Sequence, residues 1–210
     1  MIEGVPGAGK TTVAQQLSDH LIARGRPARW WLEEAKDHPI MPAGLRKTSA
    51  SPGFEQRCID AWTSFLTRET GDLIVEGVAL QNAVRFMFAQ GRPEASIVAY
   101  WRRWEAITTT RLAGFLFIAV SDLPRHYDGV FRRRGGEWTD KLIAYVETTP
   151  VALAHGWRGE AGFAAFWAAY QNLCFRLVNR MDVSPMIWPD VDYADLPAAA
   201  RAFATQSRQI

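Results

Sequence analysis

The first dozen residues contain the spacing with the clearest chemistry. Residues 4–11 read Gly-Val-Pro-Gly-Ala-Gly-Lys-Thr, and glycine, four residues and then Gly-Lys-Thr is typical of loops that bind phosphate. Glycines allow successive backbone N–H groups to turn inward toward an anion, where a Cβ atom would intrude. A helix that begins at Lys10 would add the positive end of its dipole. The sequence therefore predicts a phosphate-binding loop, against the alternative of an ordinary glycine turn before a helix.

The residues of this loop have separate expected roles toward a nucleotide and its metal. Lys10 can reach the β- and γ-phosphates and assist their transfer, and the Thr11 hydroxyl can bind Mg²⁺. ATP and Mg²⁺ are therefore the expected cofactors. The residues expected to contact ATP are Gly4, Gly7, Ala8, Gly9, Lys10, Thr11 and Thr12.

Alternating helices and strands are expected to position this loop within one domain over residues 1–210. Only three residues precede Gly4, so we expect the leading strand to be short or truncated. Further short apolar runs, of the kind that a parallel sheet buries on both faces, predict strands over 28–32, 73–75, 114–120 and 186–188. Apolar residues at helical spacing predict helices over 10–24, 54–68, 81–90, 94–111, 122–134, 138–154, 162–179 and 196–206. This alternation favours an α/β fold with a central parallel sheet.

Four features in the same order along the chain resemble the P-loop kinases. They are the loop from 4 to 12, the acidic end of the second strand, the strand that ends in Glu76, and the arginines between 125 and 134. Within that group the nucleoside and nucleotide monophosphate kinases look most similar. The resemblance implies a three-layer P-loop fold with the sheet order 2-3-1-4-5, a cleft over the carboxyl ends of the strands, and a mobile helical lid.

Acidic residues open the long loop that we predict over 33–53. Deoxynucleoside kinases similarly place a carboxylate at this point to take the proton of the acceptor hydroxyl. The resemblance therefore implies that Glu34 is the catalytic base, with Glu33 and Asp37 as further candidates, and that Asp37 and His38 contact the acceptor. A carboxylate of modest basicity suffices, because the proton moves late in a loose transition state. The alternatives are a solvated acidic turn and an ordinary loop histidine.

The strand that ends in Glu76 resembles the Walker B strand, with glutamate in place of the usual aspartate. Glu76 would lie across from Thr11 and hold Mg²⁺ through water, or it would bind the acceptor. Gln81, Asn82 and Arg85 open the next predicted helix and are expected to face the same cleft, where the resemblance implies that amides read the edge of a base. The alternatives are a charged strand end and ordinary surface amides.

A cluster of arginines is expected to form a lid over residues 125–137. Arg125 and Arg132 are seven residues apart, so a helix places them on one face, and Gly135 and Gly136 provide a hinge. A guanidinium from a closing lid stabilises the charge that spreads over the oxygens of the transferred phosphoryl group. We expect Arg132 to make the catalytic contact and Arg125 to contact the substrate. The alternative is a basic solvated surface.

Composition restricts the class of partner. The formal net charge is +2, from 24 basic and 22 acidic residues, which does not indicate nucleic-acid binding by bulk charge. The apolar run over 115–120 is far shorter than the ~20 residues of a membrane span. Cys58 and Cys174 have neither disulfide-framework nor zinc-ligand spacing. We expect a cytoplasmic protein, monomer or homodimer, that acts on a small molecule without nucleic-acid or membrane partners.

The expected function is ATP-dependent transfer of the γ-phosphoryl group to a hydroxyl or phosphate of a small acceptor. Nucleosides, nucleotides, sugar-like metabolites and antibiotics are all candidate acceptors, because specificity would lie in the loop and the lid. A nucleotide-dependent switch and a relative that binds nucleotide without turnover are the alternatives. The Asn/Thr-Lys-x-Asp motif of GTPase switches is missing from the sequence.

Overall fold

The computed structural model describes residues 1–35, 37–190 and 194–206, in which five short strands form a three-stranded and a two-stranded parallel sheet. The strands are β1 (Ile2–Gly4), β2 (Arg29–Trp31), β3 (Leu73–Val75), β4 (Leu116–Ala119) and β5 (Met186–Pro189). Three parallel pairings connect them: β2 with β3, β1 with β4, and β4 with β5. A parallel bridge between Ile2 and Glu76, with a 2.9 Å hydrogen bond from Gly77 N to Ile2 O, joins β1 to the end of β3. The prediction of a short first strand is confirmed, since β1 has three residues.

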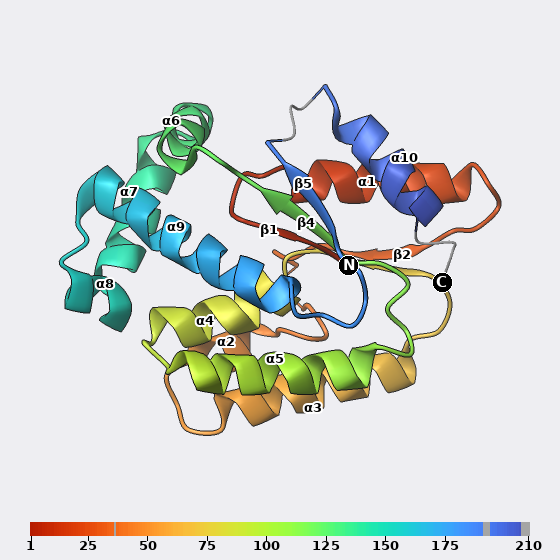
Figure 1. Cartoon of the computed structure of the whole chain (residues 1–210), viewed down its shortest axis with the longest axis horizontal. Coiled ribbons are helices and arrows are strands. Elements are labelled where there is room, and N and C mark those ends of the chain that lie inside the picture. Colours follow the sequence, from red (N-terminus) through yellow and green to blue (C-terminus); the bar gives the residue numbers. More distant parts are fainter. Residues whose placement is uncertain (36, 191–193, 207–210) are drawn as a thin grey trace.

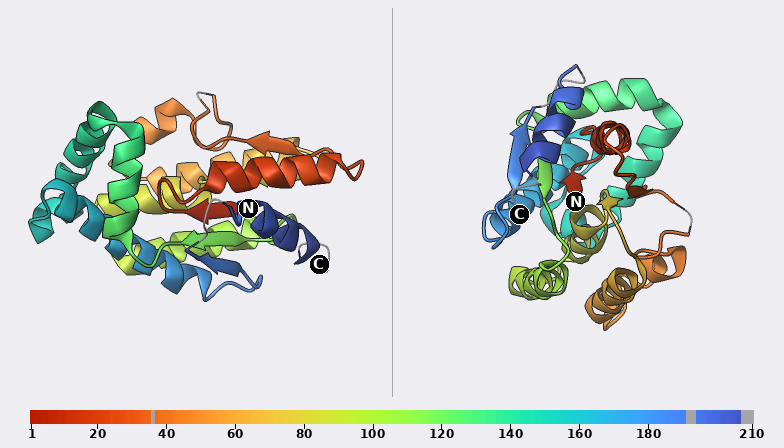
Figure 2. Two further views of the ribbon diagram at one scale, coloured as in Figure 1. Left: turned by 90° about the horizontal axis from the view of Figure 1, so that it is seen from above. Right: turned by 90° about the vertical axis from the view of Figure 1, so that its right-hand side faces the viewer.

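Helices cover both faces of the sheet (Figure 1). They are α1 (Lys10–Ile22), α2 (Ala43–Lys47), α3 (Phe54–Arg68), η1 (Ala79–Val84), α4 (Arg85–Ala89), α5 (Glu94–Thr108), α6 (Leu123–Arg134), α7 (Gly136–Glu147), α8 (Pro150–His155), α9 (Gly159–Val178) and α10 (Leu196–Gln206). Helices α1 and α10 lie side by side on one face, and α3 and α5 lie on the other. Helices α6, α7 and α8 gather beyond the carboxyl ends of the strands (Figures 1 and 2). None of the helices in the described residues is long and apolar enough to cross a membrane.

The helix predicted over 138–154 is wrong in its continuity, because two helices occupy this stretch. Helix α7 ends at Glu147, and α8 begins with Pro150. Proline has no N–H to donate and its ring clashes with the preceding turn, so it suits the first position of a new helix. The Thr149 hydroxyl accepts a 3.3 Å hydrogen bond from Ala152 N and caps α8. The Thr-Pro pair therefore ends one helix and starts the next.

The segment after β3 differs from the ordinary helix predicted over 81–90. The helical turn begins two residues earlier, at Ala79, and its first six residues form a π-helix, η1, before α4 continues it. A π-helix is wider than an α-helix and is frequent at functional sites. The long loop predicted over 33–53 also contains one short helix, α2, after Pro42.

Aromatic side chains fill the core on the side of α3 and α5. The rings of Trp101 and Trp104 stack with centroids 4.4 Å apart, and Trp62 meets Trp104 edge to face at 5.7 Å. Both cysteines are buried and free in the same core. Burial raises the pKa of the Cys58 thiol to about 12, so the thiol stays protonated at neutral pH.

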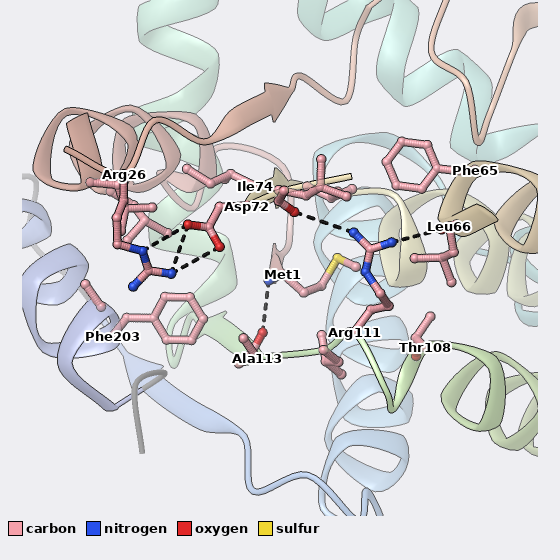
Figure 3. A pocket seen from close by; sticks show the side chains of 18 of the residues that line it. Met1, Arg26, Phe65, Leu66, Asp72, Ile74, Thr108, Arg111, Ala113 and Phe203 are labelled. Carbon is pink, nitrogen blue, oxygen red and sulfur yellow. Dashed lines mark hydrogen bonds and ion pairs between the residues drawn. The ribbon is translucent and has the colours of Figure 1, made fainter. Parts of the chain in front are cut away.

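A cavity of about 170 Å³ lies at the amino ends of the strands, opposite the glycine loop (Figure 3). Its walls come from α1, α3, α10 and two segments of the chain, residues 71–75 and 112–114. These two segments lie before the residues that pair with Ile2, the first residue of β1. The amino group of Met1 donates a 2.9 Å hydrogen bond to Gly114 O at its edge, and burial lowers the pKa of this amine to about 5. The cavity thus lies beside the first residues of β1, between the segments that lead into β3 and β4.

Candidate active site

The glycine loop connects β1 to α1 at the carboxyl end of the sheet. Its backbone curls back on itself, with a 3.2 Å hydrogen bond from Ala8 N to Val5 O. Gly7 has a φ of 78°, and a Cβ atom added there would lie 2.6 Å from a methyl group of Val130 in α6, so the turn requires glycine. Gly9 caps α1 and has no side chain to offer the first N–H groups of the helix. Those groups have no partner within a helix and commonly bind anions.

Lys10 is folded back over this loop and is only 6% exposed. Its ammonium group donates to Gly4 O at 3.3 Å and to Val5 O at 3.2 Å. It also donates to the side-chain oxygen of Gln81 at 2.5 Å and lies 3.7 Å from the Glu33 carboxylate. A buried ammonium needs such partners, because an unpaired charge is costly in a protein interior. The ammonium group is therefore fixed against the first residues of the loop.

Glu33 supplies the carboxylate nearest to this ammonium group. Gln81 Nε2 donates a 2.7 Å hydrogen bond to Glu33 Oε1. The carboxylate also packs against Gly77 so closely that a Cβ atom there would collide with it. Burial raises the pKa of Glu33, and the positive charges of Lys10 and Arg85 oppose that rise. A carboxylate with a raised pKa, beside a buried ammonium group, is suited to accept a proton.

Thr11 and Glu76 form a second polar pair beside the loop. The Thr11 hydroxyl donates a 2.9 Å hydrogen bond to Glu76 Oε1. Glu76 is 1% exposed, its Oε2 atom has no hydrogen-bond partner among the described residues, and burial raises its pKa. The described residues contain no group of three or more His, Cys, Asp or Glu side chains that could hold a metal ion. A hydroxyl with one buried carboxylate fits Mg²⁺, which commonly takes one or two protein ligands and completes its shell with phosphate and water.

The loop after β2 places its acidic residues differently from the prediction. Glu34 and Asp37 are exposed, and Glu33 takes the position beside Lys10 that we expected for Glu34. His38 is fully buried, where its Nδ1 accepts a 3.2 Å hydrogen bond from Ile40 N and its ring meets Trp31 edge-on at 5.9 Å. Burial, with the nearby Arg46 charge, lowers the pKa of His38 to about 4. The ring of His38 therefore packs in the core and lines neither of the two cavities, so the structure does not bring it to an acceptor site.

Gln81, Asn82 and Arg85 also have different surroundings. Gln81 lies between Lys10 and Glu33, as described above. Asn82 is 2% exposed and donates a 3.1 Å hydrogen bond to Gly77 O, so its amide holds the turn after β3 rather than facing an open cleft. Arg85 is half-buried, donates to Gln81 O at 2.6 Å, and donates to the Tyr145 hydroxyl of α7 at 2.7 Å.

A second cavity, of about 470 Å³, lies between the loop, the carboxyl ends of β4 and β5, and α6. All three arginines are exposed, but Arg125 and Arg133 line this cavity, whereas Arg132, the arginine expected to be catalytic, does not. The Nε2 atom of His126 lies 3.0 Å from Pro6 O, so α6 contacts the loop through this imidazole. Arg125, Gly129 and Arg133 are four residues apart and therefore share one face of α6. The packing of α6 on the loop turns this face toward the cavity.

Sequence reasoning missed three residues of the site. Glu3 is fully buried under the loop, where its carboxylate accepts hydrogen bonds from Ala79 N at 2.7 Å and Gln81 N at 3.2 Å. Burial raises the pKa of Glu3 to about 7, although Lys10 opposes the rise. A charged residue in an otherwise apolar strand was the available signal for Glu3. His126 and Tyr145 gave no such signal, because nothing in their local sequence marks the faces on which they lie.

Comparison with known proteins does not assign the chain to a family. A scan against protein-family models gives no match, and a search of curated proteins gives no significant match either.

Proposed function

We propose that this protein is a Mg-ATP-dependent phosphotransferase that moves the γ-phosphoryl group to a hydroxyl or phosphate of a small acceptor. The observation that carries the proposal is the buried Lys10 ammonium group, which is hydrogen-bonded to Gly4 O and Val5 O of the glycine loop and lies 3.7 Å from the Glu33 carboxylate. A cation for the phosphates and a base for an attacking group thereby lie side by side. A cation stabilises the charge on the transferred group, and a base assists when the acceptor is a hydroxyl.

The nucleotide would extend from the loop into the cavity beside α6. The loop N–H groups and Lys10 would bind the β- and γ-phosphates, and the cavity of about 470 Å³ would receive the rest of the nucleotide. Arg125 and Arg133 on its wall would contact the phosphates or the base, in place of Arg132. Helix α6 and Gly135, with its φ of 84°, would then form the lid over residues 125–137.

The strand pairings support a P-loop kinase fold for this domain. The pairs β2–β3 and β1–β4–β5, joined by the bridge from Ile2 to Glu76, agree with the order 2-3-1-4-5. In open α/β sheets, ligands bind outside the carboxyl ends of the strands. The glycine loop, Glu33 and Glu76 all follow a carboxyl end, which is where such a kinase would act.

Transfer would proceed by attack of the acceptor oxygen on the γ-phosphorus. The new O–P bond forms as the bond from the γ-phosphorus to the β,γ-bridging oxygen breaks, and ADP leaves with those electrons. Where the acceptor is a hydroxyl, Glu33 receives its proton. Lys10 stabilises the charge that develops on the phosphate oxygens. The Gln81 amide holds Lys10 and Glu33 in position through its hydrogen bonds to both. Thr11 and Glu76 would hold Mg²⁺, which supplies charge neutralisation on the phosphates.

A screen of small metabolites for ADP release from Mg-ATP tests the proposal. Positive compounds are incubated at scale, and ³¹P NMR must show a new phosphorylated product in amounts equal to the ADP released. Lys141→Ala, which removes an exposed lysine paired with Glu137, is the control and should behave as the wild type. ADP release at the same rate with and without every compound would instead indicate a nucleotide-hydrolysing switch, and no ADP with any compound would count against enzymatic turnover.

A further inference from the structure

A buried carboxylate, that of Glu3, lies in the first strand directly beneath the phosphate loop and is not used by the transfer chemistry above. Its side chain is 0% exposed. Its two oxygens are both engaged: Oε1 accepts from Ala79 N at 2.7 Å and Oε2 accepts from Gln81 N at 3.2 Å. A charge at such a position destabilises a fold unless it is hydrogen-bonded, so its presence requires an explanation.

The carboxylate replaces a helix cap that the local sequence does not provide. The N-cap residue of η1 is Val78, whose side chain has no hydrogen-bond acceptor. The first N–H groups of a helix have no partner within the helix, and a negative charge at that end is stabilised by the helix dipole. Glu3 supplies two acceptor oxygens to these N–H groups from β1, more than seventy residues away in the sequence. The first turn of η1 is thus held by the strand that leads into the phosphate loop.

Gln81 connects this cap to the proposed reaction. Its backbone N–H is bound by Glu3, while its side-chain oxygen accepts from Lys10 and its side-chain nitrogen donates to Glu33 at 2.7 Å. Both donor and acceptor ends of one amide are therefore occupied by the cation and the base. A shift in the first turn of η1 would move the amide away from both groups at once.

We propose that Glu3 is a positioning residue, which holds the first turn of η1 so that the Gln81 amide aligns Lys10 with Glu33. This inference rests on the proposed function for its effect on rate, although the alignment itself is a property of the protein without nucleotide. Glu3 does not touch the reacting atoms in this account. It acts only through Gln81.

The test compares Glu3→Gln, Gln81→Ala and the double variant. Glutamine has the size of glutamate but places an NH2 donor where one of the two accepting oxygens lies, so one N–H group of η1 loses its partner in this geometry. We expect each single variant to lower kcat at least about tenfold with little change in KM for ATP. The double variant should lose no more than about twofold beyond the worse single variant, because residues that act through one another are not additive. A loss in the double variant equal to the product of the single losses would overturn the inference.

A spectroscopic measurement separates this inference from the proposed function. The side-chain amide resonance of Gln81, identified by its loss in Gln81→Ala, should shift in Glu3→Gln. The matched control is Glu105→Gln, which alters another buried carboxylate that accepts a backbone hydrogen bond, from Asp182 N at 2.7 Å. Glu105→Gln should lower stability without moving the Gln81 resonance.

The two ideas can therefore fail independently. An unmoved Gln81 resonance in Glu3→Gln would refute the positioning role even if the protein transfers phosphate. A shifted resonance in a protein that turns over no ATP would refute the proposed function and leave the structural coupling standing. A thermal destabilisation in Glu3→Gln with unchanged kcat and unchanged resonance would show Glu3 to be a helix cap only.

Discussion

The two ends of the parallel sheet differ in what they bury. At the loop end, four polar side chains are nearly inaccessible: Glu3, Lys10, Glu76 and Gln81 are 0%, 6%, 1% and 8% exposed. At the opposite end, most of the cavity wall is apolar, and the side chains of the ion pair between Arg26 and Asp72 are 50% and 41% exposed (Figure 3). The sheet therefore buries polar and charged side chains at its loop end and mainly apolar side chains at its other end.

This difference separates stability from function within one fold. Buried charges contribute little net stability, because desolvation offsets much of their attraction. The ammonium group, the two carboxylates and the amide buried around the loop therefore contribute little to folding, which agrees with the role proposed for them in phosphoryl transfer. Apolar burial at the other end, by contrast, stabilises the fold directly. Variants at the two ends should accordingly affect different measurements.

The largest expected effect on stability lies at the apolar end. Trp62 is 1% exposed, lines the cavity and packs on Trp104. Trp62→Ala should lower the free energy of unfolding by about 3–5 kcal/mol, since it enlarges an existing void. Urea unfolding measures this, and kcat per folded molecule should change less than about twofold, because the site is remote. A comparable loss of kcat in the folded fraction would remove the distinction between the two ends.

The next effect is at the loop end and concerns rate rather than stability. Glu33→Gln should lower kcat at least ~10²-fold while leaving ATP affinity intact, because it removes the proton acceptor. Glu34→Gln, which changes the exposed neighbour, is the matched control and should stay within about threefold of the wild type. Steady-state kinetics with the identified acceptor measures both. Full activity in Glu33→Gln together with a large loss in Glu34→Gln would show that Glu34, and not Glu33, accepts the proton.

The buried Glu3 carboxyl should make stability depend on pH. Its pKa is about 7 in the fold and 4.5 ordinarily, so between these values the folded protein holds a proton that the unfolded chain has lost. The free energy of unfolding should therefore fall as pH rises from about 4.5 to about 7, by up to about 1.4 kcal/mol per pH unit from this group. Comparison of denaturant midpoints with Glu3→Gln, which lacks the group, isolates the slope. Parallel pH profiles in the two proteins would show that Glu3 does not titrate in this range.

The smallest effect is expected from the exposed ion pair at the apolar end. Arg26 and Asp72 make hydrogen bonds of 2.9–3.1 Å, but exposed pairs contribute about 0–1 kcal/mol because water and salt screen them. Arg26→Ala should shift the urea midpoint only slightly, and less at high salt. A shift as large as that of Trp62→Ala would mean that polar contacts at this end matter as much as apolar burial.

Local sequence patterns predicted most of the elements but not which side chain faces the site. Glycine spacing and apolar periodicity placed the loop, the strands and most helix ends, because these depend on neighbouring residues. The break at Pro150 was equally local and could have been predicted. Glu33 and Glu34 differ by one position, and the turn that the chain takes after β2 decides which of them faces Lys10.

The same reasoning applies to the arginines and to Glu3. Arg132 and Arg133 are adjacent, and packing of α6 against Gly7 through Val130 selects the face that lines the cavity. Glu3 gains its role from the N–H groups of η1, which are distant in the sequence. Long-range contacts of this kind depend on the assembled fold, so they lie beyond what periodicity and motif spacing can predict.

We propose that the loop and Lys10 form a binding site for the phosphates of ATP. Isothermal titration of Mg-ATP into the wild type, Lys10→Ala and Lys141→Ala tests it most directly, with circular dichroism to verify the fold of each. We predict saturable binding by the wild type and Lys141→Ala, and binding by Lys10→Ala that is weaker by at least about 100-fold. Equal ATP affinity in all three proteins, or none in the wild type, would contradict the account.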